Sequence, residues 1–159
     1  MKTIVVYYSL EGNTELAAKE IAKKLDADLL RLEPEKASPN SGFRKFFRGG
    51  KSAVMAEMPA LQKYAFAPAA YGRVVFGSPV WAGNMAPPLR TFIKENDLRG
   101  KRFAAFACES GSGAEKAFAK MKAALGIDGF DAELILIDPK TKPNDANLAK
   151  IDSFCAGLR

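Results

Sequence analysis

Histidine is absent from this chain of 159 residues, and cysteine occurs only at Cys108 and Cys155. The absence of histidine removes the commonest general base near neutral pH and the commonest ligand of transition metals. Each cysteine lies among apolar residues, without the paired spacing of a metal site or a redox motif, so we expect two buried free thiols. Any redox chemistry must therefore come mainly from a bound cofactor.

The chain also lacks a hydrophobic run long enough for a signal peptide or a membrane span. We therefore expect a cytoplasmic protein without integral membrane association. The formal net charge of +6 could favour nucleic acid, anionic membranes or acidic partners. A charge count by itself bears on solubility and association rather than on function, and we expect no nucleic-acid partner.

What the chain does contain is the composition of one globular domain, with 48% apolar and 26% charged residues. Short apolar strands alternate with amphipathic helices, and the length suits a single domain over residues 1–159. We expect strands at 3–8, 28–32, 71–76, 101–108 and 132–137, and helices at 13–25, from Pro87 onward, at 114–125 and at 144–158. On the last helix, the pattern puts Leu148, Ile151, Phe154 and Cys155 on one buried side. Right-handed crossovers place helices on both faces of a parallel sheet, which predicts a doubly wound, three-layer α/β/α sandwich with five strands.

Folds of this class bind ligands beyond the carboxyl ends of their strands, where the winding direction reverses. The segments that leave the first, third and fourth expected strands are 9–14, 78–84 and 109–113, and all three are rich in small or polar residues. These three loops are therefore the places where a binding site is expected.

The first loop suits a phosphate group. Ser9 and Thr14 supply hydroxyls, Asn13 supplies an amide, and the start of the following helix adds unpaired backbone N–H groups and a partial positive charge. Gly12 lets the backbone turn tightly. An ordinary helix N-cap, with Asn13 or Thr14 as the capping residue and Glu15 in the first turn, explains the same residues. The loop alone leaves both interpretations open.

The sequence of this loop, Ser9-Leu10-Glu11-Gly12-Asn13-Thr14, resembles the phosphate signature of flavodoxins: a Ser or Thr, two residues, Gly, one residue, Thr. The family's pattern continues in Gly-Ser-Pro-Val-Trp-Ala-Gly-Asn at 77–84 and in Pro-Pro-Leu-Arg-Thr-Phe at 87–92, and the order of elements matches over nearly the full chain. The resemblance implies strand order 2-1-3-4-5, FMN as cofactor, and one- or two-electron transfer. The expected FMN contacts are Ser9, Leu10, Glu11, Gly12, Asn13, Thr14, Pro79, Val80, Trp81, Ala82, Gly83, Asn84, Glu109, Ser110, Gly111 and Gly113.

Trp81 is the only tryptophan of the chain, and it follows the third strand. Its position in a loop favours stacking against the isoalloxazine ring over simple burial in the core. Ala82, Gly83 and Asn84 could then offer backbone groups to the reactive edge of the flavin. The third loop, from Glu109 onward, could bind the pyrimidine end of the flavin or frame a substrate, or it could be a flexible glycine-rich helix cap.

Two departures from the family pattern affect how the flavin would be held. Glu11 stands where many flavodoxins carry a hydroxyl residue, so we expect its carboxylate to point to solvent, away from a phosphate. Because the loop contains no lysine or arginine, phosphate binding would rely on hydroxyls, amides and the helix dipole. The third loop has no aromatic residue to cover the second flavin face, which could be open, covered by the long 33–70 connection, or closed by a partner chain. Both a monomer and a homodimer are compatible with this.

The long connection contains a possible helix at about 42–57, in which segment 43–51 interleaves four cations with three phenylalanines. A solvated basic helix with its phenylalanines packed inward is the favoured interpretation, over an anion-facing rim, a membrane-surface helix or a nucleic-acid patch. If the segment is functional, it would cover the flavin site.

Three functions fit the sequence. The favoured one is an electron-transfer flavodoxin whose partners are redox proteins or small electron acceptors. The alternative is a small FMN-dependent oxidoreductase that uses NAD(P)H to reduce quinones or similar acceptors. A flavin-free scaffold or anion-binding module is the third, since fold does not dictate function.

Overall fold

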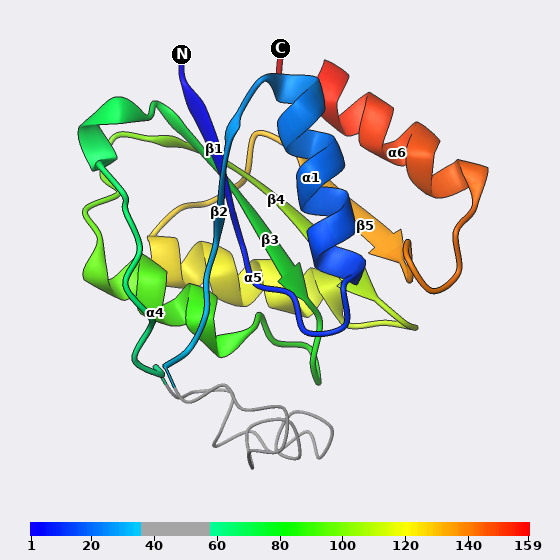
Figure 1. The fold of residues 1–159 in the computed structure, drawn as a ribbon, viewed down its shortest axis with the longest axis horizontal. Helices are drawn as coiled ribbons and strands as arrows, with labels where there is room; N and C mark the ends of the chain where they lie inside the picture. The colour runs from blue at the N-terminus through cyan, green and yellow to red at the C-terminus, as the bar shows by residue number, and fades with distance from the viewer. Residues whose placement is uncertain (36–57) are drawn as a thin grey trace.

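A computed structural model describes residues 1–35 and 58–159, whose strands form one five-stranded parallel sheet (Figure 1). The strands are β1 (Thr3–Tyr7), β2 (Asp28–Arg31), β3 (Arg73–Pro79), β4 (Arg102–Glu109) and β5 (Glu133–Ile137). Every neighbouring pair is parallel, and the order is β2-β1-β3-β4-β5. The predicted doubly wound architecture and the strand order implied by the resemblance are confirmed.

Helices cover both faces of the sheet (Figure 1). They are α1 (Asn13–Leu25), α4 (Pro87–Glu95), α5 (Ala114–Leu125) and α6 (Asp145–Ala156), with a short 3-10 turn, η1 (Pro68–Ala70), before β3. Helices α1 and α6 pack together on one face, and α4 and α5 pack together on the other. None of the helices in the described residues is both long enough and apolar enough to cross a membrane.

Two apolar cores lie on the two faces of the sheet, and the alternation of side chains along β1 explains both. Ile4 and Val6 point into the core beneath α4 and α5, whereas Val5 and Tyr7 point into the core beneath α1 and α6. All five residues of β1 are buried, as expected for a central parallel strand that is covered on both sides.

Helix α6 corrects one sequence prediction. Ile151, Phe154 and Cys155 are buried as expected, but the side chain of Leu148 is 51% exposed. Asn147 takes the buried position instead, because its side-chain amide donates a hydrogen bond to the carbonyl oxygen of Ile137 at 3.1 Å. This contact, which ties α6 to the end of β5, turns Leu148 to solvent.

The third and fourth strands run further toward the expected site than the sequence pattern predicted. β3 continues to Pro79 and β4 continues to Glu109, so the first residues of two expected ligand loops are still paired in the sheet. The helix predicted at about 42–57, with its basic segment, lies outside the described residues. The carboxyl ends of β1, β3 and β4 meet on the lower side of the view in Figure 1.

Candidate functional site

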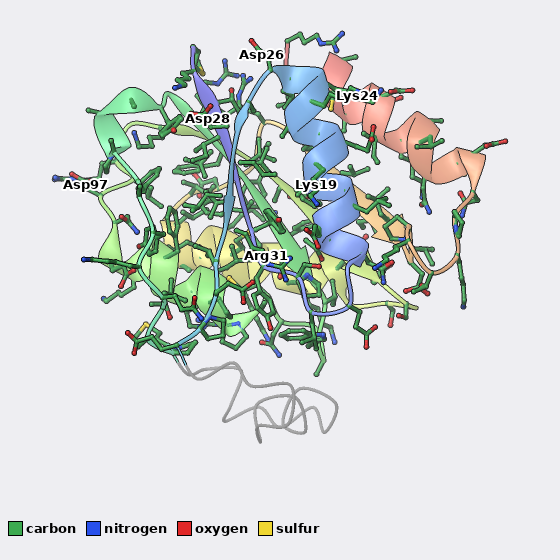
Figure 2. The ribbon with its side chains drawn as sticks, viewed as in Figure 1. Lys19, Lys24, Asp26, Asp28, Arg31 and Asp97 are labelled. Carbon is green, nitrogen blue, oxygen red and sulfur yellow. The ribbon has the colours of Figure 1, made fainter. Side chains whose placement is uncertain are left out.

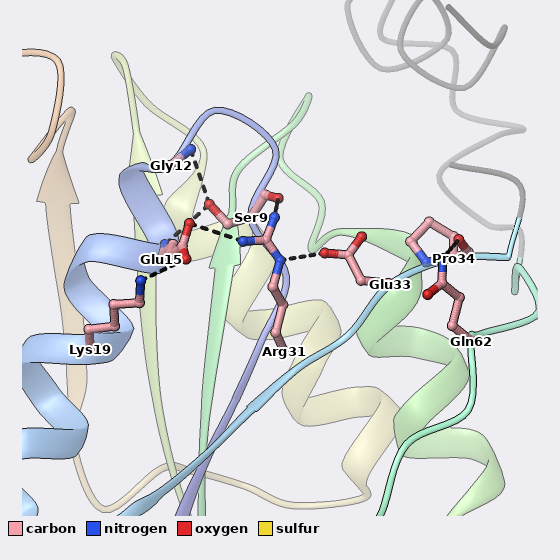
Figure 3. Close-up of polar contacts among 8 residues, drawn as sticks. All are labelled: Ser9, Gly12, Glu15, Lys19, Arg31, Glu33, Pro34 and Gln62. Atoms are coloured by element: carbon pink, nitrogen blue, oxygen red, sulfur yellow. Dashed lines mark hydrogen bonds and ion pairs between the residues drawn. The ribbon is translucent and has the colours of Figure 1, made fainter. Parts of the chain in front are cut away.

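Ser9 organises the loop that joins β1 to α1. Its side chain is 3% exposed, and its hydroxyl oxygen accepts hydrogen bonds from the amides of Gly12 at 3.2 Å and Glu15 at 3.1 Å (Figure 3). The side chain that accepts hydrogen bonds from backbone amides at the start of α1 is therefore Ser9, and not Asn13 or Thr14, the two caps considered from the sequence. Because a hydroxyl has one proton as well as two lone pairs, Ser9 can still donate a hydrogen bond to a ligand.

Thr14 lies deeper in the same loop, in the first turn of α1, with 1% of its side chain exposed. Gly12, just before the helix, has φ +100°, a conformation that side chains with a Cβ rarely adopt. The first amides of a helix have no acceptor within it, and here they are those of Asn13 and Thr14. The buried residues Ser9 and Thr14 and the start of the helix at Asn13 line the same cavity, which suits an anion.

Arg31 ties this loop to the neighbouring edge strand. It lies near the carboxyl end of β2, whereas Asp28 lies near the amino end (Figure 2). One of its terminal nitrogens donates to the carbonyl oxygen of Ser9 at 3.0 Å, and the other pairs with Glu15 at 3.0 Å (Figure 3). The planar, multiply donating guanidinium is suited to hold two acceptors at once. Arg31 thereby fixes Ser9 in place.

Glu15 has a second cation beside it, since Lys19 pairs with its carboxylate at 2.9 Å. The hydrogen bond from Lys19, together with the charge of Arg31, lowers the pKa of Glu15 below its ordinary value. The carboxylate near the start of α1 is therefore neutralised by two partners. Sequence analysis missed Arg31, because its place near the first loop follows from the parallel pairing of β2 with β1, in which Arg31 is opposite Tyr7, the last residue of β1.

The second loop is a tight turn from Trp81 to Asn84. The amide of Trp81 donates to the carbonyl of Asn84 at 3.1 Å, and the amide of Asn84 donates to the carbonyl of Trp81 at 2.9 Å. Both central residues, Ala82 and Gly83, have positive φ, which is typical of a type I′ turn. Asn84 is 8% exposed, with its side-chain amide donating to Ala82 and its side-chain oxygen accepting from Lys120. The structure thus places Asn84 inside the turn, where it locks the loop against α5.

Trp81 lies half-buried at the edge of this turn. Its ring meets the ring of Tyr8 edge to face, with 5.8 Å between the centroids and 74° between the planes. This contact joins the second loop to the end of β1. The indole is thereby held next to the first loop, in a position from which an aromatic ligand can be contacted.

The third loop is held by two carboxylates. Glu109 accepts a hydrogen bond from the amide of Ala114 at 2.9 Å and so caps α5, while Ser110 donates to Asp138 at 2.9 Å. Asp138 is 7% exposed, comes directly after β5, and was not singled out from the sequence. Gly113 lies so close to the second loop that a Cβ there would be 3.2 Å from the Cα of Gly83. The second and third loops therefore form one packed unit.

One cavity opens between the three loops, and a second opens beside the second and third loops. The smaller one, of about 220 Å³, is bounded by parts of all three loops and by the end of β5. Of the predicted contacts, its lining includes Ser9, Leu10, Glu11, Asn13, Thr14, Pro79, Val80, Trp81 and Ser110. The larger one, of about 550 Å³, is lined among others by Ala82, Gly83, Glu109, Gly111 and Gly113. Gly12 and Asn84 line neither, because Gly12 shapes the first loop and Asn84 is used within its turn.

The small cavity has two chemically different sides. Ser9 and Thr14 offer hydrogen-bond donors, whereas Val80 and Trp81 offer an apolar and aromatic surface. Glu11 is exposed and also belongs to the lining of this cavity. Such a cavity suits a ligand with an anionic end and a flat aromatic part. Within residues 1–35 and 58–159, no group of three or more acidic or cysteine side chains is placed to hold a metal ion.

Cys108 lies in the wall of this cavity but is not poised to react. Burial raises the pKa of its thiol to about 12, and a hydrogen bond with Thr14 only partly opposes that rise. Both cysteines are buried free thiols, which confirms the sequence prediction. A thiol with so high a pKa stays neutral at physiological pH and is a poor nucleophile.

Comparison with known proteins gives one family and a consistent fold. The model of the family described as "Flavodoxin" matches residues 2–148. A protein from Bacteroides eggerthii is similar in structure, with a TM-score of 0.72, 23% identity, and 96% of this chain and 97% of that chain covered. A flavoprotein from Lactobacillus acidophilus, solved in complex with FMN, has a TM-score of 0.67 at 20% identity, over 96% of this chain and 97% of that one. Oxidised flavodoxin 2 from Bacillus cereus has a TM-score of 0.64 at 18% identity, over 99% and 97%.

Proposed function

Because the chain belongs to the flavodoxin family, whose model matches residues 2–148, we propose that it binds FMN at the carboxyl ends of β1, β3 and β4 and carries electrons. The observation that carries the proposal is the small cavity, which joins buried hydroxyls at a helix start to a half-buried tryptophan. FMN has the same two parts, a phosphate and a flat aromatic ring. Hydroxyls and helix amides are a common way to bind phosphate.

The phosphate end of FMN would be held by Ser9, Thr14 and the first amides of α1. Ser9 keeps a proton to donate while its oxygen accepts two amides, so these two hydrogen bonds can stay in place when Ser9 donates to a phosphate. Glu11 lines the cavity but is exposed, so its carboxylate can lie away from the phosphate. This preorganisation reduces the entropy cost of binding.

The ring would be held by the second and third loops. Trp81 offers its indole for stacking, and the turn at Ala82 and Gly83 brings backbone groups to the ring edge. FMN, when bound, supplies the one- or two-electron chemistry, while the protein binds it, orients it and limits access of water.

The neighbouring side chains favour a carrier over an enzyme with a substrate of its own. The chain has no histidine, Cys108 is a neutral thiol, and the Glu109 carboxylate is engaged by the amide of Ala114. An acid or base that exchanges protons with a substrate would need to be free of such a role. The larger cavity beside Gly83 and Glu109 is the place where a small acceptor could approach in the alternative, NAD(P)H-dependent function.

A pair of kinetic assays tests the carrier function. In the first, the FMN-loaded protein is mixed with NADH or NADPH and a quinone, and free FMN at the same concentration is the control. We expect turnover no faster than that of free FMN. In the second, the chemically reduced protein is mixed with a one-electron acceptor such as cytochrome c, and we expect rapid stoichiometric oxidation. Rapid NAD(P)H-dependent turnover would contradict the carrier function and support the oxidoreductase.

A further inference from the structure

Lys140 reaches the phosphate-binding loop from a distant part of the chain. It lies in the connection between β5 and α6, and its side chain passes over Gly12. A Cβ atom at Gly12 would lie 2.6 Å from the ammonium nitrogen of Lys140 and 2.9 Å from its Cδ. A side chain at position 12 would therefore displace the end of the Lys140 side chain from this path.

Asn13 fixes the backbone of the same connection. Its side-chain oxygen accepts hydrogen bonds from the amide of Lys140 at 2.8 Å and from the amide of Thr141 at 3.2 Å. The connection is further closed by the amide of Lys142, which donates to the carbonyl of Asp138 at 2.7 Å. A side chain in the first turn of α1 therefore anchors the lysine beside the loop, although 127 positions separate the two residues.

The charges around the loop leave this lysine available. The loop itself contains no lysine or arginine, and the nearby carboxylate of Glu15 already pairs with Lys19 and Arg31. Lys140 makes no ion pair with any residue in the part of the chain that the structure describes, and its side chain is exposed. Its ammonium group is therefore available to a phosphate dianion bound at the start of α1.

We propose that Lys140 supplies the positive charge that binds the phosphate of the flavin, and that Asn13 is its positioning residue. This inference rests on the proposed FMN site. Lys140 is not in the lining of the small cavity, but its ammonium group lies beside Gly12, between the lining residues Glu11 and Asn13, and the flexible four-carbon stem of lysine lets it turn toward a bound phosphate. The site then combines hydroxyls and amides, which orient the phosphate, with one mobile cation, which balances part of its charge.

The chemical consequence is selectivity for FMN over riboflavin, which lacks the phosphate. A charge-assisted hydrogen bond contributes about twice as much as a neutral one, so losing it should weaken FMN binding about tenfold at low salt. Riboflavin binding should not change. Because the contact is exposed to solvent, the tenfold difference should shrink as ionic strength rises.

The test compares FMN and riboflavin titrations of the flavin-free wild-type protein with those of Lys140→Gln, followed by flavin fluorescence. Lys140→Arg keeps the charge and should stay close to wild type. Lys150→Gln, on the exposed side of α6, makes the same change of net charge away from the loop and should leave both affinities unchanged.

Asn13→Ala tests the positioning role. Asn13→Ala should lower the FMN affinity by a smaller factor than Lys140→Gln does. Because the two residues act together, Lys140→Gln should lower the FMN affinity less in the Asn13→Ala protein than in the wild type. Urea unfolding of the flavin-free variants shows whether a weaker FMN affinity is accompanied by a loss of stability.

Two negative results have different meanings. A wild-type protein that takes up no FMN would overturn both the proposed function and this inference. A wild-type protein that binds FMN, combined with a Lys140→Gln variant whose preference for FMN over riboflavin is unchanged, would overturn the role of Lys140 alone.

Discussion

Replacing Gly12 by alanine perturbs the loop in two ways that can be separated by comparison with Gly126→Ala. Both glycines have positive φ, +100° at Gly12 and +69° at Gly126. Forcing a residue with a Cβ into this region costs roughly 1–2 kcal/mol of unfolding free energy. At Gly126, which ends α5, no atom lies within 4 Å of the new Cβ. At Gly12 the new Cβ meets Lys140, whose flexible end can move aside at little cost.

Both variants should therefore lose stability, but they should differ in binding. Urea denaturation of the flavin-free proteins, extrapolated linearly to water, should give a loss of about 1–2 kcal/mol for Gly126→Ala and at least as large a loss for Gly12→Ala, whose backbone lies further from the left-handed region that alanine can adopt. FMN titration should show wild-type affinity for Gly126→Ala and an affinity at least about tenfold weaker for Gly12→Ala, because that variant displaces the cation beside the phosphate. The reasoning would be refuted by equal FMN affinities in the two variants, or by a Gly12→Ala protein as stable as wild type.

Three further predictions concern single side chains. Ser9→Ala leaves the amides of Gly12 and Glu15 without their acceptor and should lower the free energy of unfolding by about 2 kcal/mol. Urea denaturation measures this loss. As a control, Ser153→Ala on the exposed side of α6 should have little effect. Cys108 and Cys155 are buried, and burial raises the pKa of both thiols. A thiol reagent at pH 8 should therefore label neither cysteine in the folded protein and both cysteines in urea. Fast labelling without urea would contradict their burial. Burial and a hydrogen bond to a glutamate of α4 raise the pKa of Tyr64 to about 12. Since this folded value lies above the unfolded one, the stabilisation is complete below about pH 10 and is lost as the pH rises toward 12. The free energy of unfolding should therefore fall less in Tyr64→Phe than in the wild type between pH 10 and pH 12. An equal fall in the two proteins would contradict this role of Tyr64.

The fold could be predicted from the sequence because its signals are local. Apolar runs such as Thr3–Tyr7 mark buried strands, and periodic apolar residues such as those of Asn13–Leu25 mark helices. The strand order was not available from the pattern itself and came from the resemblance to flavodoxins. Leu148 was placed wrongly because helical spacing does not show that a polar neighbour, Asn147, can occupy the buried position through a hydrogen bond to Ile137.

The candidate site was predictable only in part, for a related reason. The three loops were identified because each directly follows a strand of the sheet. Arg31, Asp138 and Lys140 were missed because they come from β2 or from the segment that follows β5, and only the three-dimensional fold brings them to the first and third loops. Asn13 was expected to face a phosphate, and its contact with Lys140 depends on a segment more than a hundred residues away.

The central claim is that one FMN binds in the cavity between these loops, and the most direct test is a fluorescence titration of the flavin-free protein with FMN. The structure predicts saturation at one FMN per chain for the wild type. It also predicts loss of binding in Thr14→Glu, which places a carboxylate where the phosphate would lie. A wild-type protein that takes up no FMN, or a Thr14→Glu variant that binds FMN as tightly as wild type, would contradict the claim.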